Sequence, residues 1–522
     1  MAITYINDDR IGPSARIDAT TNPEIGDGDM LWIGEDATIL ATGADAVRFV
    51  GIEELDIAVD GDVFGMNIGL LMSFNDVNEA ISTRHSLTLS ETGSVRSEDR
   101  FAARLKGAGE DKDTRAIVSN AGEISTNATG EAALEMSDYA RVLVDNSGLI
   151  ASDTFTFGRA LRIDGPNITL QNRGDIVMTS TAPISVDTLQ QATGYAAVEL
   201  TTTSNDPSAF EVNNSGLISG TFAALAIEGA GAEISNSGMI DGDIFTDDFD
   251  VALTNSGTID GRVSFGAGDD LIDGFGGLIT GRIDAGDGND VIRSGYGNDV
   301  IDGGDGGDLI NGGLGEDWAE YVNSFEGVAL DFRSGVGFGQ GGHAAGDTVL
   351  NVENIRGSDF ADAFKGDVNA NILEGGGGND DLRGFGGDDT LDGGAGNDVL
   401  FGFADDDILD GGAGADVMVG GDGRDVFRFD DGDTGRGAQS DRINDFGADD
   451  ILDLSGIDAI AGGDDNSFDL VQFFTGAGGE ARFLTNGAGE VVLQYDIDGD
   501  QVPDGAIIFA NGYMPEIDQL VL

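Results

Sequence analysis

The chain has 522 residues, with 26 Lys and Arg against 96 Asp and Glu, so its formal net charge is -70. It contains no Cys, which excludes disulfides, and its charge disfavours nucleic acid and anionic lipid as partners because both carry the same sign as the protein. Hydrophobic residues still make up 40% of the chain, so we expect it to fold once cations neutralise part of the charge.

The N-terminal segment, MAITYINDDRIGPSARIDA, has neither a basic region nor an apolar stretch of the kind found in export signals. No run of about 18 apolar residues occurs anywhere in the sequence. We therefore expect no cleavable export signal and no membrane-spanning segment.

A short motif, apolar-x-Asn-x-Gly-x-Ile, recurs through the first half of the chain. Its copies are Val118–Ile124, Val144–Ile150, Leu170–Ile176, Val212–Ile218, Ile234–Ile240 and Leu253–Ile259. The Asn residues follow one another at spacings of 26, 26, 42, 22 and 19. Such a period, with short strands between Gly or polar corners, predicts a parallel β-solenoid with loop insertions over residues 1–264. The Asn residues are expected to form a hydrogen-bonded ladder between coils.

Charged residues of this half allow two interpretations. The arginines concerned could belong to a solvated face of the solenoid or could help a polysaccharide-modifying enzyme to bind its substrate. They are Arg104, Arg115, Arg141, Arg159 and Arg162. His85 is expected at the surface of a strand rather than as a catalytic acid or base. The solvated face is the simpler interpretation.

A second repeat, nine residues long, dominates the second half. One copy, FGAGDDLID, occupies residues 265–273, four more fill residues 285–320, and eight run without interruption through residues 357–428. In the last block the sixth position is Asp in all but one copy and the eighth is always apolar. One inward-pointing side chain per nonapeptide is therefore predicted. A non-repetitive spacer, residues 321–356, separates the two blocks.

The chemistry of the nonapeptide follows from its spacing. Glycines at positions one, two and four permit a tight turn, and the Asp at position six leads into a strand. If two nonapeptides form one coil, residues 18 apart stack, and pairs such as Asp380 with Asp398 can hold a cation between them. Oxygen ligands at variable coordination number favour calcium over zinc, which prefers His or Cys.

These units resemble the GGxGxDxUx nonapeptides of the RTX (repeats-in-toxin) family. The resemblance implies a right-handed parallel β-roll over residues 265–320 and 357–428, with several calcium ions between successive turns. The implied ligands are the position-six residues Asp270, Asp290, Asp299, Asp308, Asp317, Asp362, Asp380, Asp389, Asp398, Asp407, Asp416 and Asp425. Asn371 departs from the motif, and residues 357–365 lack its glycines, so the sites at that edge are less well supported.

Residues 429–522 change to alternating apolar and polar positions. They resemble the C-terminal domain of serralysin-type metalloproteases, which implies a β cap on the roll and an uncleaved type I secretion signal ending in DQLVL. The acids of DIDGDQVPD are equally consistent with a further calcium loop and with a solvated hairpin turn; they are Asp496, Asp498, Asp500 and Asp504. No HExxH motif occurs and His85 and His343 are the only histidines, so no zinc protease site is expected.

Together these features predict an all-β protein in which a solenoid runs into the roll blocks and ends in a β cap. The expected function is that of a secreted, extracellular protein that folds on calcium after export by a type I secretion apparatus. Its solenoid would be the binding or structural surface of an adhesin, a matrix protein or a surface-layer component, with a polysaccharide or a cell surface as partner. The alternative is an extracellular polysaccharide lyase or epimerase acting in a solenoid groove.

Overall fold

The computed structural model is all-β over the residues that it describes, with strands, turns and two short 3-10 helices, Gly342–Ala344 and Ile517–Gln519. The described residues are 3–6, 10–11, 17–18, 29–33, 38–41, 47–50, 54–60, 62–65, 70–73, 84–98, 100–107, 114–128, 131–154, 158–180, 195–202, 210–430, 433, 439–457 and 468–521. Among them, no helix is long and apolar enough to cross a membrane. The chain divides into two compact units, Met1–Asp299 and Val300–Leu522.

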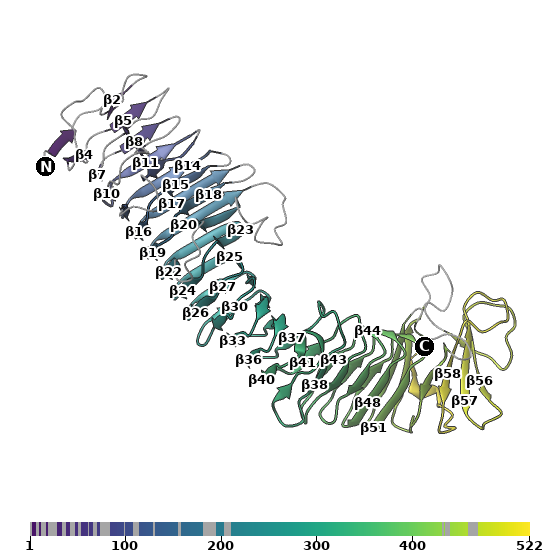
Figure 1. The fold of residues 1–522 in the computed structure, drawn as a ribbon. Coiled ribbons are helices and arrows are strands. Elements are labelled where there is room, and N and C mark those ends of the chain that lie inside the picture. Colours follow the sequence, from purple (N-terminus) through teal and green to yellow (C-terminus); the bar gives the residue numbers. More distant parts are fainter. Residues whose placement is uncertain are drawn as a thin grey trace. The chain divides into compact units, whose positions relative to one another are not determined.

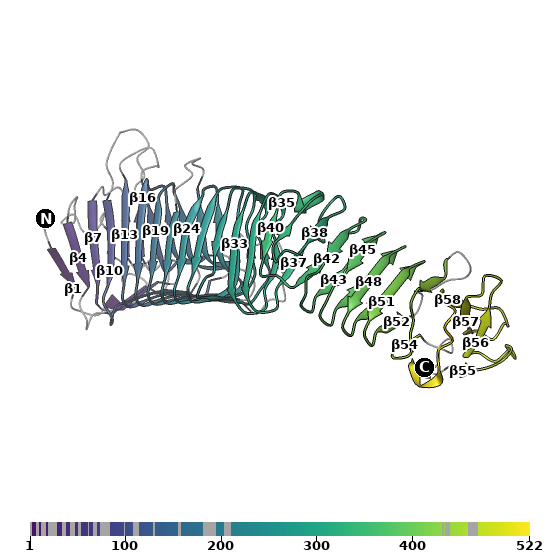
Figure 2. The ribbon, with the colours of Figure 1, turned by 90° about the horizontal axis from the view of Figure 1, so that it is seen from below.

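The first unit is a parallel solenoid in which each coil contributes strands to three sheets (Figure 1). Sheet 1 contains β1 (Ile3–Ile6), β4 (Asp29–Ile33), β7 (Glu54–Val59), β10 (Arg84–Leu89), β13 (Arg115–Asn120), β16 (Arg141–Asn146), β19 (Ile168–Asn172), β22 (Phe210–Asn214), β24 (Ala232–Asn236), β26 (Val251–Asn255), β29 (Leu271–Asp273) and β33 (Val291–Tyr296). Figure 2 shows several of these strands side by side, in chain order.

The other two sheets repeat this parallel order. Sheet 2 contains β2 (Arg10–Ile11), β5 (Thr38–Ala41), β8 (Asp62–Gly65), β11 (Ser94–Ser97), β14 (Glu123–Thr126), β17 (Leu149–Thr154), β20 (Asp175–Ser180), β23 (Leu217–Glu228), β25 (Met239–Thr246), β27 (Thr258–Asp260) and β30 (Leu278–Ile279). Sheet 3 contains β3 (Ile17–Asp18), β6 (Val47–Val50), β9 (Leu70–Ser73), β12 (Ala103–Lys106), β15 (Ala132–Ser137), β18 (Arg159–Asp164), β21 (Ala196–Thr201), the second parts of β23 and β25, β28 (Val263–Ser264) and β31 (Ile283–Asp284).

The repeated Asn of the first unit ends successive strands of sheet 1 and is buried. The amide nitrogen of each Asn donates to the amide oxygen of the next, at 2.8 Å in every step. The ladder consists of Asn120, Asn146, Asn172, Asn214, Asn236 and Asn255. The predicted solenoid with an Asn ladder is therefore confirmed, and insertions between coils explain the unequal spacings.

His85 corrects one expectation. Alternation along β10 exposes Arg84 and turns the side chain of His85 inward, where it is 1% exposed. Its Nδ1 lies 2.5 Å from the hydroxyl of Tyr139, which is also fully buried. The prediction of a surface position is wrong, because the strand places this polar residue at a core position with a hydrogen-bond partner.

The second unit is a roll of short strands in two long sheets; most of these strands pair in parallel, but the three between residues 480 and 509 pair antiparallel with one another. One sheet contains β34 (Val300–Asp302), β37 (Trp318–Glu320), β41 (Asn354–Arg356), β43 (Ile372–Glu374), β46 (Thr390–Asp392), β49 (Ile408–Asp410), β52 (Val426–Asp430), β54 (Ile451–Gly456) and β59 (Leu520–Val521). The other contains β38 (Ala329–Asp331), β42 (Ala363–Lys365), β45 (Asp381–Arg383), β48 (Val399–Ala404), β51 (Val417–Asp422), β53 (Asp441–Ile443), β58 (Gly505–Phe509), β57 (Val491–Asp496), β56 (Glu480–Thr485) and β55 (Asp469–Leu470).

Successive nonapeptides alternate between these two sheets, so every second one lies in the same sheet. The eighth position is fully buried in all eight copies of the last block; these residues are Phe364, Leu373, Leu382, Leu391, Leu400, Leu409, Met418 and Phe427. Further strands accompany them: β36 (Leu309–Leu314) pairs with β40 (Thr348–Leu350), and β40 with β39 (Gly337–Phe338). A separate small sheet contains β44 (Gly377–Gly378), β47 (Ala395–Gly396) and β50 (Ala413–Gly414). The prediction of one core side chain per nonapeptide is confirmed.

We expect the Asn ladder to contribute strongly to the stability of the first unit. Asn214→Ala removes a donor and an acceptor from buried partners and should lower the free energy of unfolding by about 3 kcal/mol. Asn213→Ala, at the neighbouring half-buried position, should change it by less than about 0.5 kcal/mol. Hydrogen exchange of peptides covering β19 to β26 measures both. Equal protection in the two variants would contradict this role of the ladder.

Candidate metal sites in the nonapeptide turns

The Asp at position six of each nonapeptide is bonded to the coil before it. The backbone N–H of Asp380 donates to Oδ1 of Asp398 at 2.7 Å, and that of Asp398 donates to Oδ1 of Asp416 at 2.7 Å. In the alternate nonapeptides, the N–H of Asp389 donates to Asp407 at 2.9 Å and that of Asp407 to Asp425 at 3.1 Å. The structure thus contains two Asp ladders, and both have the 18-residue step that the sequence predicts.

The second carboxylate oxygen has no such partner. Oδ2 is buried without a hydrogen bond in Asp270, Asp380, Asp389, Asp398, Asp407, Asp416 and Asp425. It lies against the first glycine of its own nonapeptide: a Cβ added at Gly393 or Gly411 would come within 2.7 Å of this oxygen. A buried carboxylate oxygen without a donor is unfavourable unless it binds a proton or a cation. The repeated turn therefore has a gap in its polar contacts that a cation would fill.

Burial changes the proton affinity of these carboxylates. Desolvation raises the pKa of Asp389 and of Asp416 to about 8, although a backbone N–H from the preceding coil lowers it. The pKa of Asp407 rises to about 7 for the same reason, and the nearby carboxylate of Asp425 raises it further. Burial also raises the pKa of Asp270 and Asp380 to about 7 and that of Asp398 and Asp425 to about 6. Without a cation, the ladders hold protons near neutral pH.

The donor set indicates which cation fits. The turns offer carboxylate and backbone carbonyl oxygens, and the described part of the second unit places no imidazole in the Asp ladders. Hard divalent cations prefer such ligands, and irregular oxygen sites favour calcium over magnesium, which demands near-octahedral geometry. These residues therefore fit calcium.

The two positions that the sequence marked as atypical also differ in structure. Both oxygens of Asp362 accept hydrogen bonds, from the N–H of Val328 at 2.6 Å and from the N–H of Ser358 at 2.7 Å. Ser358 stands where four other copies of the block have glycine, and its hydroxyl contacts the same carboxylate at 3.1 Å. Asn371 accepts from Asp367 and donates to the carbonyl of Glu353 at 2.8 Å. Neither side chain leaves an oxygen available, so this edge is a poor cation site.

Three acids that the repeat pattern missed continue the ladders. The N–H groups of Asp308, Asp416 and Asp425 donate to carboxylates of Asp347, Asp441 and Asp450, at 2.9, 2.9 and 3.1 Å. Each new acid is followed two residues later by a buried apolar residue, which is the spacing of positions six and eight without the glycines. A search for an Asp followed two residues later by an apolar residue, without the glycines, could have identified these three acids.

The remaining predicted ligands are Asp290, Asp299, Asp308 and Asp317, all of them buried. The pairs Asp290 with Asp308 and Asp299 with Asp317 combine residues of the two units and stay predictions. In the first unit, the N–H of Asp270 donates to Oδ1 of Asp290 at 2.7 Å, which is the ladder contact of the second unit at a 20-residue step.

The C-terminal acids form a separate group. Ligand atoms of Asp496, Asp498 and Asp504 lie within 4.8 Å of one another, and Asp500 is outside the group. Asp496 already accepts from the N–H groups of Gly499 and Gln501. Both predicted interpretations of this loop, a calcium site and a hydrogen-bonded turn, remain open.

The arginines of the solenoid fall into two places. On sheet 3, Arg104 pairs with Glu135 at 2.9 Å, while Arg159 and Arg162 both pair with Glu199. Glu135 and Glu199 are 6% and 1% exposed, so buried carboxylates alternate with partly exposed arginines in this row. Arg115 and Arg141 lie apart from it, on sheet 1.

The raised pKa values predict an unusual pH dependence for the calcium-free protein. The unfolded carboxyls titrate near 3.8 and the folded ones between about 6 and 8, so the folded form binds more protons in this window and its stability falls as pH rises through it. In chelator, circular dichroism should show more folded roll at pH 5 than at pH 8. A calcium-free stability that rises from pH 5 to pH 8 would contradict this.

Comparisons with known proteins agree with the geometry. A family model described as the RTX calcium-binding nonapeptide repeat (4 copies) matches residues 284–319, 365–400 and 401–434, about one fifth of the chain. A search of the curated proteins found no match. The matched segments contain ten of the predicted position-six ligands: Asp290, Asp299, Asp308 and Asp317 in the first, Asp380, Asp389 and Asp398 in the second, and Asp407, Asp416 and Asp425 in the third. The chain therefore contains RTX calcium-binding nonapeptide repeats over residues 284–319, 365–400 and 401–434.

Proposed function

We propose that this is a secreted extracellular protein whose roll folds when the Asp ladders bind several calcium ions, and whose solenoid is a binding or structural surface. The observation that carries the proposal is the row of buried Oδ2 atoms without a hydrogen-bond partner at the matched position of successive nonapeptides. The predicted ligands with this feature are Asp270, Asp380, Asp389, Asp398, Asp407, Asp416 and Asp425. Each is an oxygen ligand positioned by the backbone of the neighbouring coil.

The calcium dependence of folding follows from these contacts. Without calcium, folding buries a stack of carboxylates in a chain of net charge -70, and self-repulsion opposes the compact state. A site that binds only the folded form adds about 1.4 kcal/mol when calcium is at tenfold its dissociation constant. A few such sites together reach about 5 kcal/mol, which is the stability of a small domain. Calcium would therefore decide whether the roll folds.

This dependence suits export by a type I secretion apparatus. In a cytosol poor in calcium the acidic roll would stay unfolded, as passage through a narrow channel requires, and outside the cell calcium would complete it. The serralysin-like C-terminal segment would carry the secretion signal. Its final strand, Leu520–Val521, pairs with β54 and so would close one sheet of the roll after export.

The solenoid supports a binding or structural role in an adhesin, a matrix or a surface layer. Sheet 1 presents a long face of regularly spaced polar side chains over a self-contained Asn ladder. Three of the arginines considered for the polysaccharide-enzyme alternative lie on sheet 3, where they pair with the carboxylates of Glu135 and Glu199. That pairing favours a structural role for this group over acid–base catalysis.

Calcium titration tests the folding proposal. In chelator at pH 7.5 we expect peptides of the roll to exchange their amide hydrogens freely, while the Asn-ladder strands β16 to β26 stay protected. Protection of the roll and β-sheet circular dichroism should appear with a midpoint of roughly 10⁻⁴ to 10⁻³ M calcium. Magnesium at equal concentration is the control. A roll that is equally protected in chelator would overturn the proposal.

Substitution of a single ladder residue tests the ligands. Asp398→Asn removes a charge at a buried oxygen and should weaken calcium binding at that turn about tenfold, because a neutral amide is a poorer ligand. Without calcium the same change should stabilise the roll, since it removes a buried carboxylate. Asp422→Asn makes the same charge change at an exposed position and should do neither. Calorimetry of both variants with and without calcium distinguishes these outcomes, and equal behaviour of the two would exclude Asp398 as a ligand.

A further inference from the structure

We propose that sheet 1 of the solenoid binds an acidic polysaccharide, a polyuronate, through the stacked arginines Arg84, Arg115 and Arg141. This inference rests on the proposed role of the solenoid as a binding surface and names its partner. The site is separate from the nonapeptide turns and from the arginine and glutamate group of sheet 3.

The three arginines occupy the same position in successive coils. Backbone pairing places Arg84 opposite Arg115 and Arg115 opposite Arg141, and all three side chains are exposed. Neighbouring strands lie about 4.8 Å apart, so the guanidinium groups form a row with one charge per coil. In a chain with only 26 basic residues, such a row is a local positive surface that can pair with an anion of matching spacing.

A hollow lies beside this row and has the chemistry of a sugar site. Its volume is about 270 Å³. The residues that line it are Arg115, Ala116, Ile117, Arg141, Val142, Leu143, Asn167 and Thr169. Leu143 is 37% exposed, so an aliphatic surface lies next to the guanidinium groups. A uronate unit would pack its C–H face on Leu143, direct its carboxylate to an arginine and its hydroxyls to Asn167 and Thr169.

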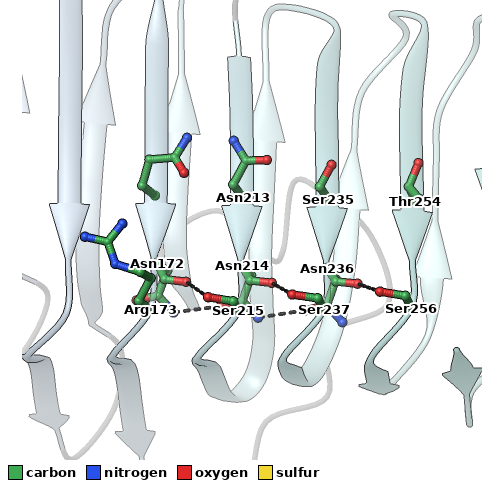
Figure 3. Close-up of a pocket in the computed structure, with 11 residues that line it drawn as sticks. Asn172, Arg173, Asn213, Asn214, Ser215, Ser235, Asn236, Ser237, Thr254 and Ser256 are labelled. Atoms are coloured by element: carbon green, nitrogen blue, oxygen red, sulfur yellow. Dashed lines mark hydrogen bonds between the residues drawn. The ribbon is translucent and has the colours of Figure 1, made fainter.

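The same sheet offers a path for a longer chain. A groove of about 400 Å³ follows β19, β22, β24 and β26, and its outward residues Asn213, Ser235 and Thr254 carry uncharged amide or hydroxyl groups (Figure 3). Arg173 lies at one end of the groove and pairs with Asp145. Polar groups at one per coil match the repeating hydroxyls of an extended polysaccharide.

Two glutamates on sheet 1 limit where the uronate units of the polysaccharide can lie. The row that contains Ile117, Leu143 and Thr169 continues to Glu211 and Glu233 in the next coils. These carboxylates would repel an anionic chain. The uronate carboxylates are therefore placed over β10, β13 and β16, and the chain would leave toward the uncharged groove.

Charge density favours a polyuronate over the other polyanions. Duplex DNA carries a charge about every 1.7 Å, far more than one arginine per coil can neutralise, and the rest of the protein repels it. An anionic membrane would bring the flanking acids Glu211 and Glu233 to the same surface. A polyuronate has one charge per sugar, which the arginine row matches.

Binding of a labelled polygalacturonate oligomer to the full calcium-loaded chain tests the proposal. The fully methyl-esterified oligomer serves as the uncharged control. We expect the double variant Arg115→Gln/Arg141→Gln to bind at least about tenfold more weakly, and Arg141→Lys to keep most of the affinity. Arg96→Gln, an exposed arginine on sheet 2 that pairs with Glu123, should change affinity less than about twofold. Leu143→Asp is a second variant, and it should weaken binding without altering an arginine.

Calcium bridges between the polymer and the acidic roll are the competing explanation. They predict unchanged affinity in the double variant at fixed free calcium, and that result would overturn the proposal. Equal binding of the esterified oligomer, or tighter binding of duplex DNA or phosphatidylserine vesicles, would overturn it too. Calcium-induced circular dichroism of the same samples reports on the proposed function separately, so failure of folding and failure of polymer binding are distinguishable.

Discussion

The buried carboxylate of each nonapeptide is the constraint on which the second unit depends. One oxygen of Asp398 accepts the backbone N–H of the preceding coil and thereby sets the 18-residue register, while the other is enclosed by its own glycine turn without a partner. The hydrogen bond holds the Asp to the preceding coil, and the buried second oxygen makes that coil unfavourable without a cation. Register and metal binding are thus two consequences of one side chain.

The first unit uses a different residue at its corners. There Asn214 accepts from Asn172 and donates to Asn236, so the amide satisfies the neighbouring coils without any added ion. The amide carries both a donor and an acceptor, whereas a carboxylate carries acceptors alone. In the function that we propose, this difference lets one chain combine a solenoid whose corners need no added ion with a roll whose folding responds to calcium.

Much of this architecture follows from local sequence. The apolar eighth position, as in Leu400, and the Asp two residues before it predicted the roll, its core and its ladder partners, because each nonapeptide specifies its own turn. Asp347, Asp441 and Asp450 were missed because their turns lack the glycines that define the motif, although they make the same backbone contacts. The missing glycines around Asp362 mark its site as atypical in the sequence, but only the contacts of Val328 and Ser358 show that both of its oxygens are satisfied.

Contacts between coils that are joined by loops of unequal length could not be predicted from the sequence. Arg115 and Arg141 follow the 26-residue step of the recurring Asn, but Arg84 precedes Arg115 by 31 residues and lies outside that repeat, so only strand pairing shows that all three stack. The inward position of His85 depends on the phase of β10 and on a hydroxyl 54 residues away. In each case the decisive partner comes from another coil, and the intervening loop hides the relation.

The most direct test of the account is a crystal structure of the calcium-loaded protein with data collected at a wavelength where calcium scatters anomalously. The account predicts anomalous peaks beside Oδ2 of the position-six aspartates in the uninterrupted block, including Asp389, Asp398 and Asp407, and weaker or no peaks beside Asp362 and Asn371. A fully folded roll without peaks at these oxygens would contradict it.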